Sequence, residues 1–528
     1  MKNNIAMVSN EILRPKEEVG CRIESGGYFG TVRYIGKLPD YPGIWYGIEW
    51  DDPTRGKHNG TVNGVQYFQT KHLTSGSFVR REKINFGRSL IEAIIVRYSG
   101  QESDLMKRIH EQQLISLQKS IKAPFIEFVG FEKVSTKQSN FEALGIVSVR
   151  LQNVSFIGEP NELGRLCPNI REIDISRNLF TSWADVLNIC QQLPQLYWLN
   201  ISENLLELPE EINDVYPNIS VFICGNMNLT WTDIKRLSKI FPNINELRAN
   251  NNYITDLTTE DKNNFNNLEI LDLEENPIKD WDEVRKLKTI KSLQNLSLDG
   301  TGLESINFKT KEQTLDYFLN LSKLCISNNL ISDWLSLSEL NKLPNLEELK
   351  FINCPILKSE NAETASAIVI AKIRSLKIYN GRIINHEDRR GSELDYMKKY
   401  GLEWLRVKNT PDQVKFLEEH NRYLELIKEY GELEAGELQI PDTTLKNALI
   451  NLNLVYNEQT VIKKISPAML VQKLKILVRR LFKLDDFPEL VCITEEGRYE
   501  IPLDDDTKEI SYFSVNDNDT IIVKPATN

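Results

Sequence analysis

One short loop, residues 56–60, combines a positive charge with hydrogen-bond donors. Lys57 carries the charge, and His58 and Asn59 offer donors to carboxylate oxygens. Gly56 and Gly60 flank them and have no side chain, so a bound peptide can approach the loop backbone closely. These residue types and their spacing suit an acidic ligand.

Aromatic residues near this loop in the sequence could complete a binding site. Trp45, Phe68 and Phe78 could line an apolar slot for an aromatic ring of the ligand. Phe68 and Trp50 fit the core of a small β domain equally well, so both interpretations stay open for them. We interpret His58 as a hydrogen-bond donor rather than a metal ligand.

The elements that must position these residues are short strands separated by glycines. Apolar and β-branched runs at 30–36, 43–50 and 76–80 predict a small antiparallel β-barrel with tight turns. The order and spacing over residues 19–84 resemble the CAP-Gly domain family. That resemblance implies a groove that grips the acidic, aromatic-ended C-terminal tails of tubulin and similar proteins.

The loop departs from the usual CAP-Gly pattern at two positions. Most members of the family have Gly-Lys-Asn-Asp-Gly, whereas this chain has His58 in place of the Asn and Asn59 in place of the Asp. We associate the histidine with the cofactor E branch of the family. Asn59 removes a negative charge near a groove for acids, and it can also change the geometry of the loop.

Composition and charge exclude several classes of protein. A formal net charge of −11 argues against a general nucleic-acid binder. No apolar run approaches the roughly 20 residues that span a bilayer, and no signal peptide is evident at Met1–Met7. The seven cysteines contain no Cys-x-x-Cys pair, which predicts neither a disulfide framework nor a zinc site. We expect a cytoplasmic protein that contacts no membrane.

The sequence contains no catalytic signature that we could identify. Gly30–Lys37 has the spacing Gly-x5-Gly-Lys followed by Leu38, which is not that of a phosphate-binding loop. The five histidines are scattered, at 58, 72, 110, 386 and 420. We therefore predict a protein that is not an enzyme and that has no cofactor and no metal site.

An internal repeat fills residues 145–385. The pattern L-x-L-x-x-N, or a close variant, recurs nine times at steps of 22–28 residues, for example Leu271-x-Leu273-x-x-Asn276. This period predicts a leucine-rich-repeat solenoid of short strands. In the third full copy we assign Val221-x-Ile223-x-x-Asn226. Thr301 and Cys354 replace the Asn in two copies and can substitute for it only partly.

Two sets of residues recur at fixed positions of the repeat. Trp183, Trp231, Trp281 and Trp334 each follow the repeat Asn by five residues, and we interpret them as core rather than as a ligand surface. Strand residues that flank the inward leucines should line the concave face, where leucine-rich repeats usually bind protein. The candidates for partner binding there are Asp174, Trp198, Phe222, Arg248, Asp272 and Lys323.

The C-terminal region changes pattern twice. Residues 386–440 are charged and mostly helical in pattern, which predicts a cap on the solenoid. From 441 onward, strands at 449–456, 490–494, 499–503 and 520–524 surround a helix that we expect to start at Ser466-Pro467. This order resembles the ubiquitin-like β-grasp. Because the chain ends without Gly-Gly, we expect non-covalent binding rather than conjugation.

The expected fold class is therefore a multidomain protein: a small β-barrel, a leucine-rich-repeat α/β solenoid and an α+β ubiquitin-like β-grasp. The predicted boundaries are a tail at 1–14, the CAP-Gly domain at 15–86, a linker and solenoid cap at 87–144, repeats at 145–385, a helical cap at 386–440 and the ubiquitin-like domain at 441–528.

This order of domains resembles the tubulin-folding cofactor E family. The resemblance implies binding to α-tubulin and, with other tubulin-folding cofactors, assembly or dissociation of the α/β-tubulin heterodimer in the cytoplasm, in association with the cytoskeleton. One alternative is a microtubule-associated adaptor. Another is a shuttle for the proteasome or other ubiquitin machinery that acts through the C-terminal domain.

Overall fold

The computed structural model describes residues 15–99, 140–208, 214–258, 265–310, 312, 314–438, 449–457, 459–493, 500–513 and 515–525. It divides into two compact units. The first holds the N-terminal domain, the solenoid and most of the helical cap, and the second holds residues 401–406 and everything from 432 onward. The predicted tail at 1–14 and part of the predicted linker lie outside the described residues.

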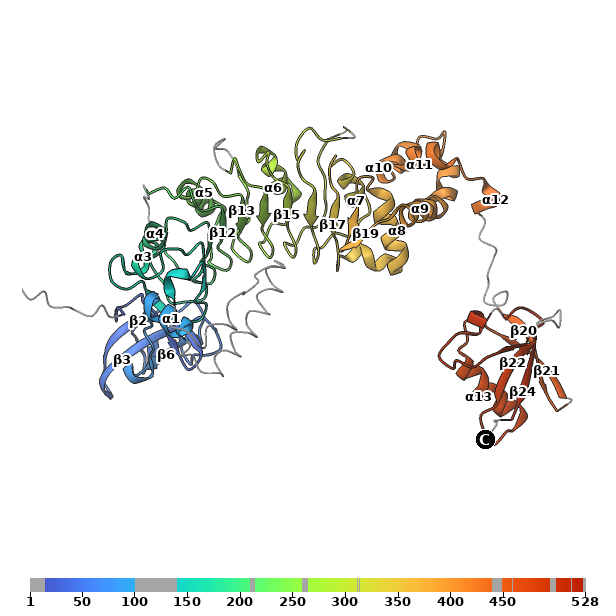
Figure 1. The fold of residues 1–528 in the computed structure, drawn as a ribbon, viewed down its shortest axis with the longest axis horizontal. Coiled ribbons are helices and arrows are strands. Elements are labelled where there is room, and N and C mark those ends of the chain that lie inside the picture. Colours follow the sequence, from blue (N-terminus) through green and yellow to red (C-terminus); the bar gives the residue numbers. More distant parts are fainter. Residues whose placement is uncertain are drawn as a thin grey trace, which may run out of the picture. The chain divides into compact units, whose positions relative to one another are not determined.

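The N-terminal domain is an antiparallel sheet with an added hairpin (Figure 1). The sheet has the order β1-β2-β3-β6, and the hairpin pairs β4 with β5. Its strands are β1 Arg22–Ser25, β2 Tyr28–Leu38, β3 Tyr41–Trp50, β4 Thr61–Val62, β5 Val65–Gln66 and β6 Gly76–Val79. A cluster that includes Ile23, Val32, Ile48 and Trp50 forms its core. Trp50 is therefore a core residue, as one of the two interpretations held.

Residues 87–99 attach this domain to the first repeat. Strand β7 (Arg88–Ser89) pairs in parallel with β9 (Val154–Phe156). Helix α1 (Leu90–Tyr98) begins at Ser89, whose side chain accepts a hydrogen bond from the Glu92 N–H, and it buries Leu90, Ile91, Ala93 and Ile94. This apolar helix covers the open end of the solenoid, where the first repeat has no preceding repeat to pack on.

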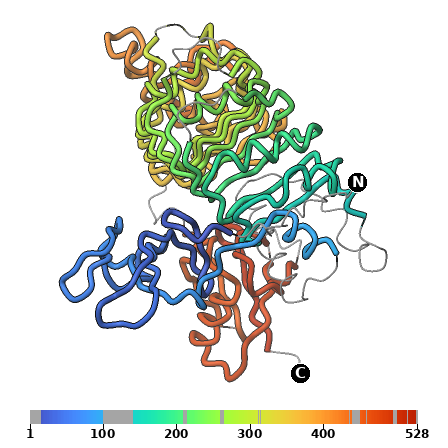
Figure 2. The backbone as a smooth tube through the Cα atoms, turned by 90° about the vertical axis from the view of Figure 1, so that its left-hand side faces the viewer, coloured from blue at the N-terminus to red at the C-terminus, as the bar shows by residue number. Residues whose placement is uncertain are grey.

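The repeats build one sheet whose strands follow one another in chain order, and successive turns stack along the axis (Figure 2). All neighbours pair in parallel except the last two. The strands are β8 Ile146–Ser148, β10 Glu172–Asp174, β11 Trp198–Asn200, β12 Val221–Ile223, β13 Glu246–Arg248, β14 Ile270–Asp272, β15 Asn295–Ser297, β16 Lys323–Cys325, β17 Glu348–Lys350, β18 Ile378–Tyr379 and β19 Arg382–Ile383.

A ladder of buried asparagines holds the turns that follow these strands. The Asn276 amide donates to the carbonyls of Ala249 and Leu273 at 2.9 and 3.1 Å, and its oxygen accepts from the N–H groups of Asn252 and Ile254 at 3.0 and 3.2 Å. Asn178, Asn252 and Asn329 make the same kind of contacts. One side chain therefore satisfies backbone groups in two adjacent repeats, which would otherwise be buried without partners. Thr301 substitutes for the asparagine only in part, because its one hydroxyl lies 3.1 Å from both the Leu298 carbonyl and the Asn329 Oδ1.

The third full repeat differs from the sequence prediction by one residue. Phe222 pairs with Leu199 and Leu247, so it occupies the inward position, and it is fully buried against Phe241. Met227, not Asn226, then takes the place of the ladder asparagine and is buried. Phe222 is therefore wrong as a residue of the concave face.

Helices cover the convex side of the sheet (Figure 1). They are α3 Glu162–Leu166, α4 Trp183–Gln192, α5 Trp231–Ile240, α6 Trp281–Arg285, α7 Leu335–Leu340 and α8 Ala362–Lys372. Trp183, Trp231 and Trp281 each take the first helical position, directly after a Ser, Thr or Asp cap. The repeat tryptophans are buried, which confirms their interpretation as core.

Helices α9 His386–Val407, α10 Gln413–Glu419 and α11 Tyr423–Tyr430 form the C-terminal cap, and α12 Ala435–Leu438 follows. The cap is joined to the last repeats through a buried polar cluster. The Lys372 amine donates to the Ser338 hydroxyl at 2.8 Å and to the Glu419 carbonyl at 2.5 Å, and Arg422 pairs with Glu393 at 3.0 Å. The Arg422–Glu393 ion pair can be buried at a tolerable cost because the two charges compensate each other, whereas the partners of Lys372 are uncharged.

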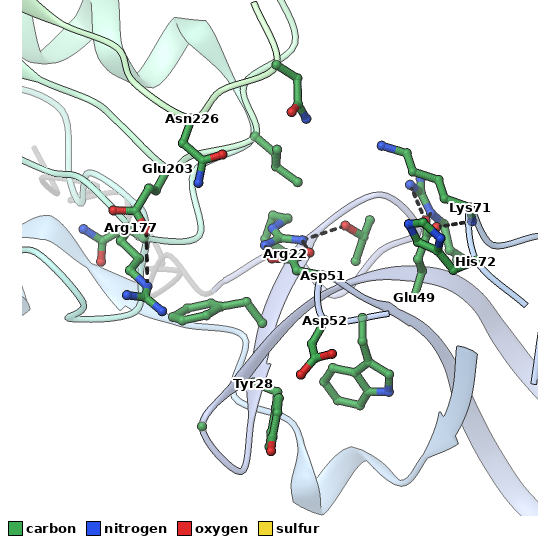
Figure 3. Close-up of a pocket in the computed structure, with 18 of the residues that line it drawn as sticks. Arg22, Tyr28, Glu49, Asp51, Asp52, Lys71, His72, Arg177, Glu203 and Asn226 are labelled. Carbon is green, nitrogen blue, oxygen red and sulfur yellow. Dashed lines mark hydrogen bonds and ion pairs between the residues drawn. The ribbon is translucent and has the colours of Figure 1, made fainter. Parts of the chain in front are cut away.

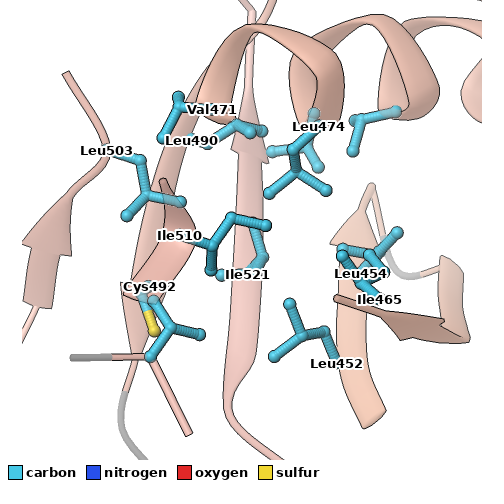
Figure 4. Packing of buried hydrophobic residues seen from close by; sticks show 13 residues of the cluster. Leu452, Leu454, Ile465, Val471, Leu474, Leu490, Cys492, Leu503, Ile510 and Ile521 are labelled. Atoms are coloured by element: carbon cyan, nitrogen blue, oxygen red, sulfur yellow. The ribbon is translucent and has the colours of Figure 1, made fainter. Parts of the chain in front are cut away.

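The C-terminal domain is a five-stranded sheet of order β21-β20-β24-β22-β23 packed on one helix, the topology of a β-grasp. Its elements are β20 Ile450–Tyr456, β21 Gln459–Ile465, α13 Val471–Phe482, β22 Glu489–Ile493, β23 Glu500–Pro502 and β24 Thr520–Lys524. Leu452, Leu474, Cys492 and Ile521 meet in its core (Figure 4).

The helix of this domain starts later than the sequence predicted. Residues 466–469 form a turn, closed by a bond from the Met469 N–H to the Ser466 carbonyl at 2.9 Å. Leu470 then precedes the first helical residue, Val471. The Ser-Pro pair therefore belongs to the turn and not to the helix. The sequence prediction was wrong because turns and helix starts favour the same residue types. Among the described residues, none of the helices has the length and apolar character needed to cross a bilayer.

Candidate functional site

A row of three residues crosses one face of the N-terminal sheet. Tyr34 on β2 and Phe78 on β6 both pair with Gly47 on β3, so the three lie side by side. Because Gly47 has no side chain, the two rings meet across it at 5.9 Å and nearly at right angles. The next position of β3 on this face is Trp45, which pairs with Gly36.

Phe68 and Tyr67 pack against this row on the face that carries the two rings. A Cβ at residue 47 would lie 2.4 Å from the Phe68 ring, so the ring lies directly against the glycine. Phe78 contacts Phe68 at 5.4 Å and Tyr67 at 5.6 Å, both edge to face. Phe68 is buried but lies outside the core cluster of the domain. It belongs to the aromatic cluster of this face, made of Tyr34, Tyr67, Phe68 and Phe78.

The loop at 56–60 borders the aromatic cluster. Its backbone pairs with β6, since the Lys57 N–H donates to the Gly76 carbonyl at 2.7 Å and the Gly76 N–H donates to the His58 carbonyl at 2.7 Å. Gly60 has a φ of +94°, and a Cβ there would lie 2.0 Å from the Phe68 carbonyl. This position therefore requires glycine. The His58 ring lies 5.4 Å from Phe78 and 6.1 Å from Phe68.

The charges at this site favour an anionic ligand. Within the described residues, Lys57 is exposed and makes no ion pair. The Arg80 guanidinium stacks over the Trp45 ring at 3.8 Å and likewise pairs with no described carboxylate. Burial lowers the pKa of His58 below its usual value, so this ring is neutral at neutral pH. A carboxylate ligand would thus meet two unpaired cations.

The structure brings together most of the predicted groove residues. Lys57, His58, Asn59 and Gly60 form one loop, and Phe68 and Phe78 lie beside it. Trp45 lies on the same face but is not part of the aromatic cluster. Its ring contacts Tyr41 at 5.9 Å and the Arg80 guanidinium.

Sequence reasoning missed Tyr34, Tyr67 and Arg80. Tyr34 and Gly36 are two residues apart in β2 and therefore share one face of the sheet, which was the available signal for the first of them.

Several of the concave-face candidates form hydrogen bonds or ion pairs with other residues of this chain. Asp174 is only 6% exposed, and its carboxylate accepts from the Ser176 N–H at 2.9 Å, so it caps its own strand and offers little to a partner. Arg248 pairs with Glu246 at 2.5 Å, and Lys323 pairs with Glu348 at 2.8 Å. Trp198 and Asp272 are half-buried. Partner binding by these residues stays a prediction.

A polar cleft of about 650 Å³ lies between the N-terminal domain and the first repeats (Figure 3). Its wall carries four basic residues, Arg22, Arg33, Lys71 and Arg177, and four acidic ones, Glu49, Asp51, Asp52 and Glu203. Most of them pair with one another, as Arg33 does with Glu49 at 2.8 Å and Arg177 with Glu203 at 3.5 Å. The cleft therefore has no excess of one charge, and the surface formed by the loop at 56–60 and the aromatic cluster is the stronger candidate site.

The described residues contain no group of three or more His, Cys, Asp or Glu side chains that could hold a metal ion. All seven cysteines are free thiols. Burial raises the pKa of several of them, including Cys190 to about 12, so these thiols are protonated at neutral pH.

Comparison with known proteins assigns the N-terminal domain to a defined class. The family model described as the CAP-Gly domain matches residues 19–84, which contain the whole loop and the aromatic cluster. The molecule is thus a CAP-Gly protein in which that domain precedes a leucine-rich-repeat solenoid and a β-grasp.

Full-length relatives narrow the class to one family. Tubulin-specific chaperone E of Xenopus laevis is 35% identical over 96% of this chain and 98% of its own length, and the human protein of the same name is 34% identical over 96% and 98%. The ubiquitin-like domain of mouse tubulin-specific chaperone E covers 17% of this chain at 23% identity, with a TM-score of 0.15. The chain belongs to the tubulin-specific chaperone E family, which confirms the resemblance seen in its sequence.

Proposed function

We propose that this protein is a tubulin-folding cofactor that binds α-tubulin and, with partner cofactors, assembles or dissociates the α/β-tubulin heterodimer. The observation that carries the proposal is the match to tubulin-specific chaperone E along 96% of the chain. The protein acts by binding, without catalysis of its own, in the cytoplasm and in association with the cytoskeleton.

The groove of the CAP-Gly domain is the proposed contact with the C-terminal tail of α-tubulin. Such a tail ends in carboxylates and an aromatic ring. Lys57, His58 and Asn59 bind the carboxylates, and the ring packs against Phe78 in the aromatic cluster. Arg80, held over Trp45, attracts the acidic residues further up the tail. The unpaired state of both cations in the described structure supports this assignment.

The other two domains are the proposed contacts for further proteins. Trp198, Arg248, Asp272 and Lys323 on the concave face serve either the folded part of tubulin or another tubulin-folding cofactor. The β-grasp domain binds non-covalently to the chaperone network, or to the proteasome and other ubiquitin machinery. Mixing the full chain with proteasomes tests the last of these partners.

Size-exclusion chromatography with purified tubulin dimer tests the proposed function. The full chain should shift the elution of tubulin, and adding the other cofactors should change the ratio of dimer to free α-tubulin. Pelleting with assembled microtubules distinguishes a folding cofactor from the main alternative, a microtubule-associated adaptor. An adaptor would sediment with the lattice, whereas a folding cofactor should stay with soluble tubulin and reduce the pellet. Stable co-sedimentation without loss of polymer would contradict the proposal.

A further inference from the structure

The His58 ring is held in its loop by one hydrogen bond and by aromatic neighbours. Its Nδ1 accepts a hydrogen bond from the Gly60 N–H at 3.0 Å, two residues further along the loop. The backbone N–H and the backbone carbonyl of His58 both form hydrogen bonds with Gly76 of β6. Phe78 lies against the ring at 5.4 Å with an interplanar angle of 35°, and Phe68 lies 6.1 Å away. The imidazole is therefore held by backbone on one edge and by aromatic rings around it.

The bond from Gly60 determines where the imidazole carries its proton. A nitrogen that accepts a hydrogen bond cannot carry hydrogen, so in neutral His58 the proton is on Nε2. Protonation of Nδ1 would replace this bond with two N–H groups that face each other. Burial disfavours the charged ring as well. Nε2 has no hydrogen-bond partner among the described residues.

We propose that His58 binds a carboxylate of the tubulin tail as a neutral Nε2–H donor, so that Lys57 supplies the charge in this loop and binding does not depend on the protonation of the histidine. This inference rests on the proposed function of the groove. It gives the substitution of His for Asn a chemical meaning, because a locked neutral imidazole and an asparagine amide both present an uncharged N–H.

The surrounding charges are compatible with a neutral ring. The charged or titratable side chains on the segments packed around His58 are Lys57 on its own loop, Tyr67, Lys71 and His72 on the segment of Phe68, Arg80 at the end of β6, and Glu49 of β3, which pairs with Gly76. The one carboxylate among them, Glu49, pairs with Arg33 at 2.8 Å and accepts from the Lys71 N–H at 2.6 Å, and the cations do not favour a positive charge on His58. Within the described structure no carboxylate accepts from its ring.

The test uses the full chain and a synthetic peptide that ends in Glu-Glu-Tyr, with calorimetry between pH 6.0 and 8.5. The affinity of the unaltered protein should vary by less than about twofold over this range. His58→Phe keeps an aromatic ring but removes the donor, and it should weaken binding about tenfold at every pH. His58→Asn should recover most of that loss. His72→Asn, on the neighbouring turn, is the matched control and should bind as the unaltered protein does.

A second measurement reports the tautomer directly. In the full chain labelled with 15N histidine, the His58 signals, assigned by their loss in His58→Asn, should show protonated Nε2 and bare Nδ1 at pH 7. A proton on Nδ1, or an affinity that falls about tenfold per pH unit above pH 6 and becomes flat in His58→Asn, would overturn the inference alone. Equal binding by His58→Phe and the unaltered protein would do the same. Failure of the unaltered protein to bind the peptide at any pH would overturn the proposed groove together with the inference.

Discussion

The ring of Phe68 occupies the space that a side chain at Gly47 would need. A Cβ on residue 47 would lie 2.4 Å from this ring and 3.0 Å from the Tyr34 Cβ. The glycine therefore creates the room in which Phe68 packs against His58 and Phe78. A glycine inside a strand thus determines whether the aromatic cluster can form.

Replacing Gly47 with alanine should displace Phe68 and disrupt the groove. Overpacking at such a site costs roughly 1–3 kcal/mol of the free energy of unfolding. We expect a lower midpoint of unfolding for the CAP-Gly domain and weaker binding of the tail peptide. Gly391→Ala in helix α9, where an added Cβ meets open space, is the control and should change neither. Undisturbed peptide affinity in Gly47→Ala would show that Phe68 is not part of the groove.

The aromatic end of the tail should matter more to binding than the charge of Lys57. Because Lys57 is exposed, an ion pair with a tail carboxylate contributes only about 0.2–1 kcal/mol, less than a buried charge-assisted bond would. Lys57→Ala should therefore weaken binding by up to about fivefold, mostly at low salt. Removing the terminal tyrosine of the peptide should weaken it at least as much, because the aromatic cluster then loses its contact.

Calorimetry at two salt concentrations separates these contributions. Lys83→Ala, on the exposed 3-10 turn of the same domain, provides the control for a general loss of charge. Equal affinity for peptides with and without the tyrosine would argue against the groove model and in favour of α-tubulin recognition by the concave face of the repeats.

The register of the third full repeat can be tested with two neighbouring residues. Phe222 is fully buried, whereas Val221 is half-buried on the concave face. Phe222→Ala should cost roughly 3–5 kcal/mol in the free energy of unfolding, and Val221→Ala should cost about 1 kcal/mol or less. Chemical unfolding of both variants checks the pair. Similar losses, or a larger one for Val221, would support the register assigned from the sequence.

The sequence was a good guide wherever one periodic pattern dominated. The repeat length and the buried tryptophans follow from local spacing, and the structure has both. In the C-terminal domain the structure has the four strands named from the sequence and adds β21, to which no residues had been assigned. The register predicted for the third full repeat was wrong because residues 221–224 are all apolar. Alternation of apolar and polar residues therefore could not determine which of them point inward.

Features built by distant residues could not be predicted. The row of Tyr34, Gly47 and Phe78 depends on strand pairing, which the sequence does not state. The buried cluster of the helical cap joins Ser338, Lys372 and Glu419, which lie far apart in the chain. No local pattern marks a lysine of an apolar helix as a buried donor.

Lys372 should make the stability of the solenoid depend on pH. Burial lowers its pKa to about 7, and the nearby Glu419 and Asp333 oppose this shift only partly. In the unfolded chain the same amine has its ordinary pKa of about 10.4. Between these two values the unfolded state binds a proton that the folded state does not. The free energy of unfolding should therefore rise with pH above about 7, by up to roughly 1.4 kcal/mol per pH unit from this group.

Chemical unfolding between pH 7 and 9 checks this slope. Lys372→Met keeps the length of the side chain and cannot be protonated, so the rise with pH should be reduced in this variant. Lys398→Met, on the exposed face of α9, is the control and should keep the slope of the unaltered protein. Because Ser338 also donates to the Glu419 carbonyl, that acceptor keeps one partner in Lys372→Met, and the variant should still fold. An unchanged slope in Lys372→Met would mean that the folded protein holds this amine protonated throughout, as an ion rather than as a neutral base.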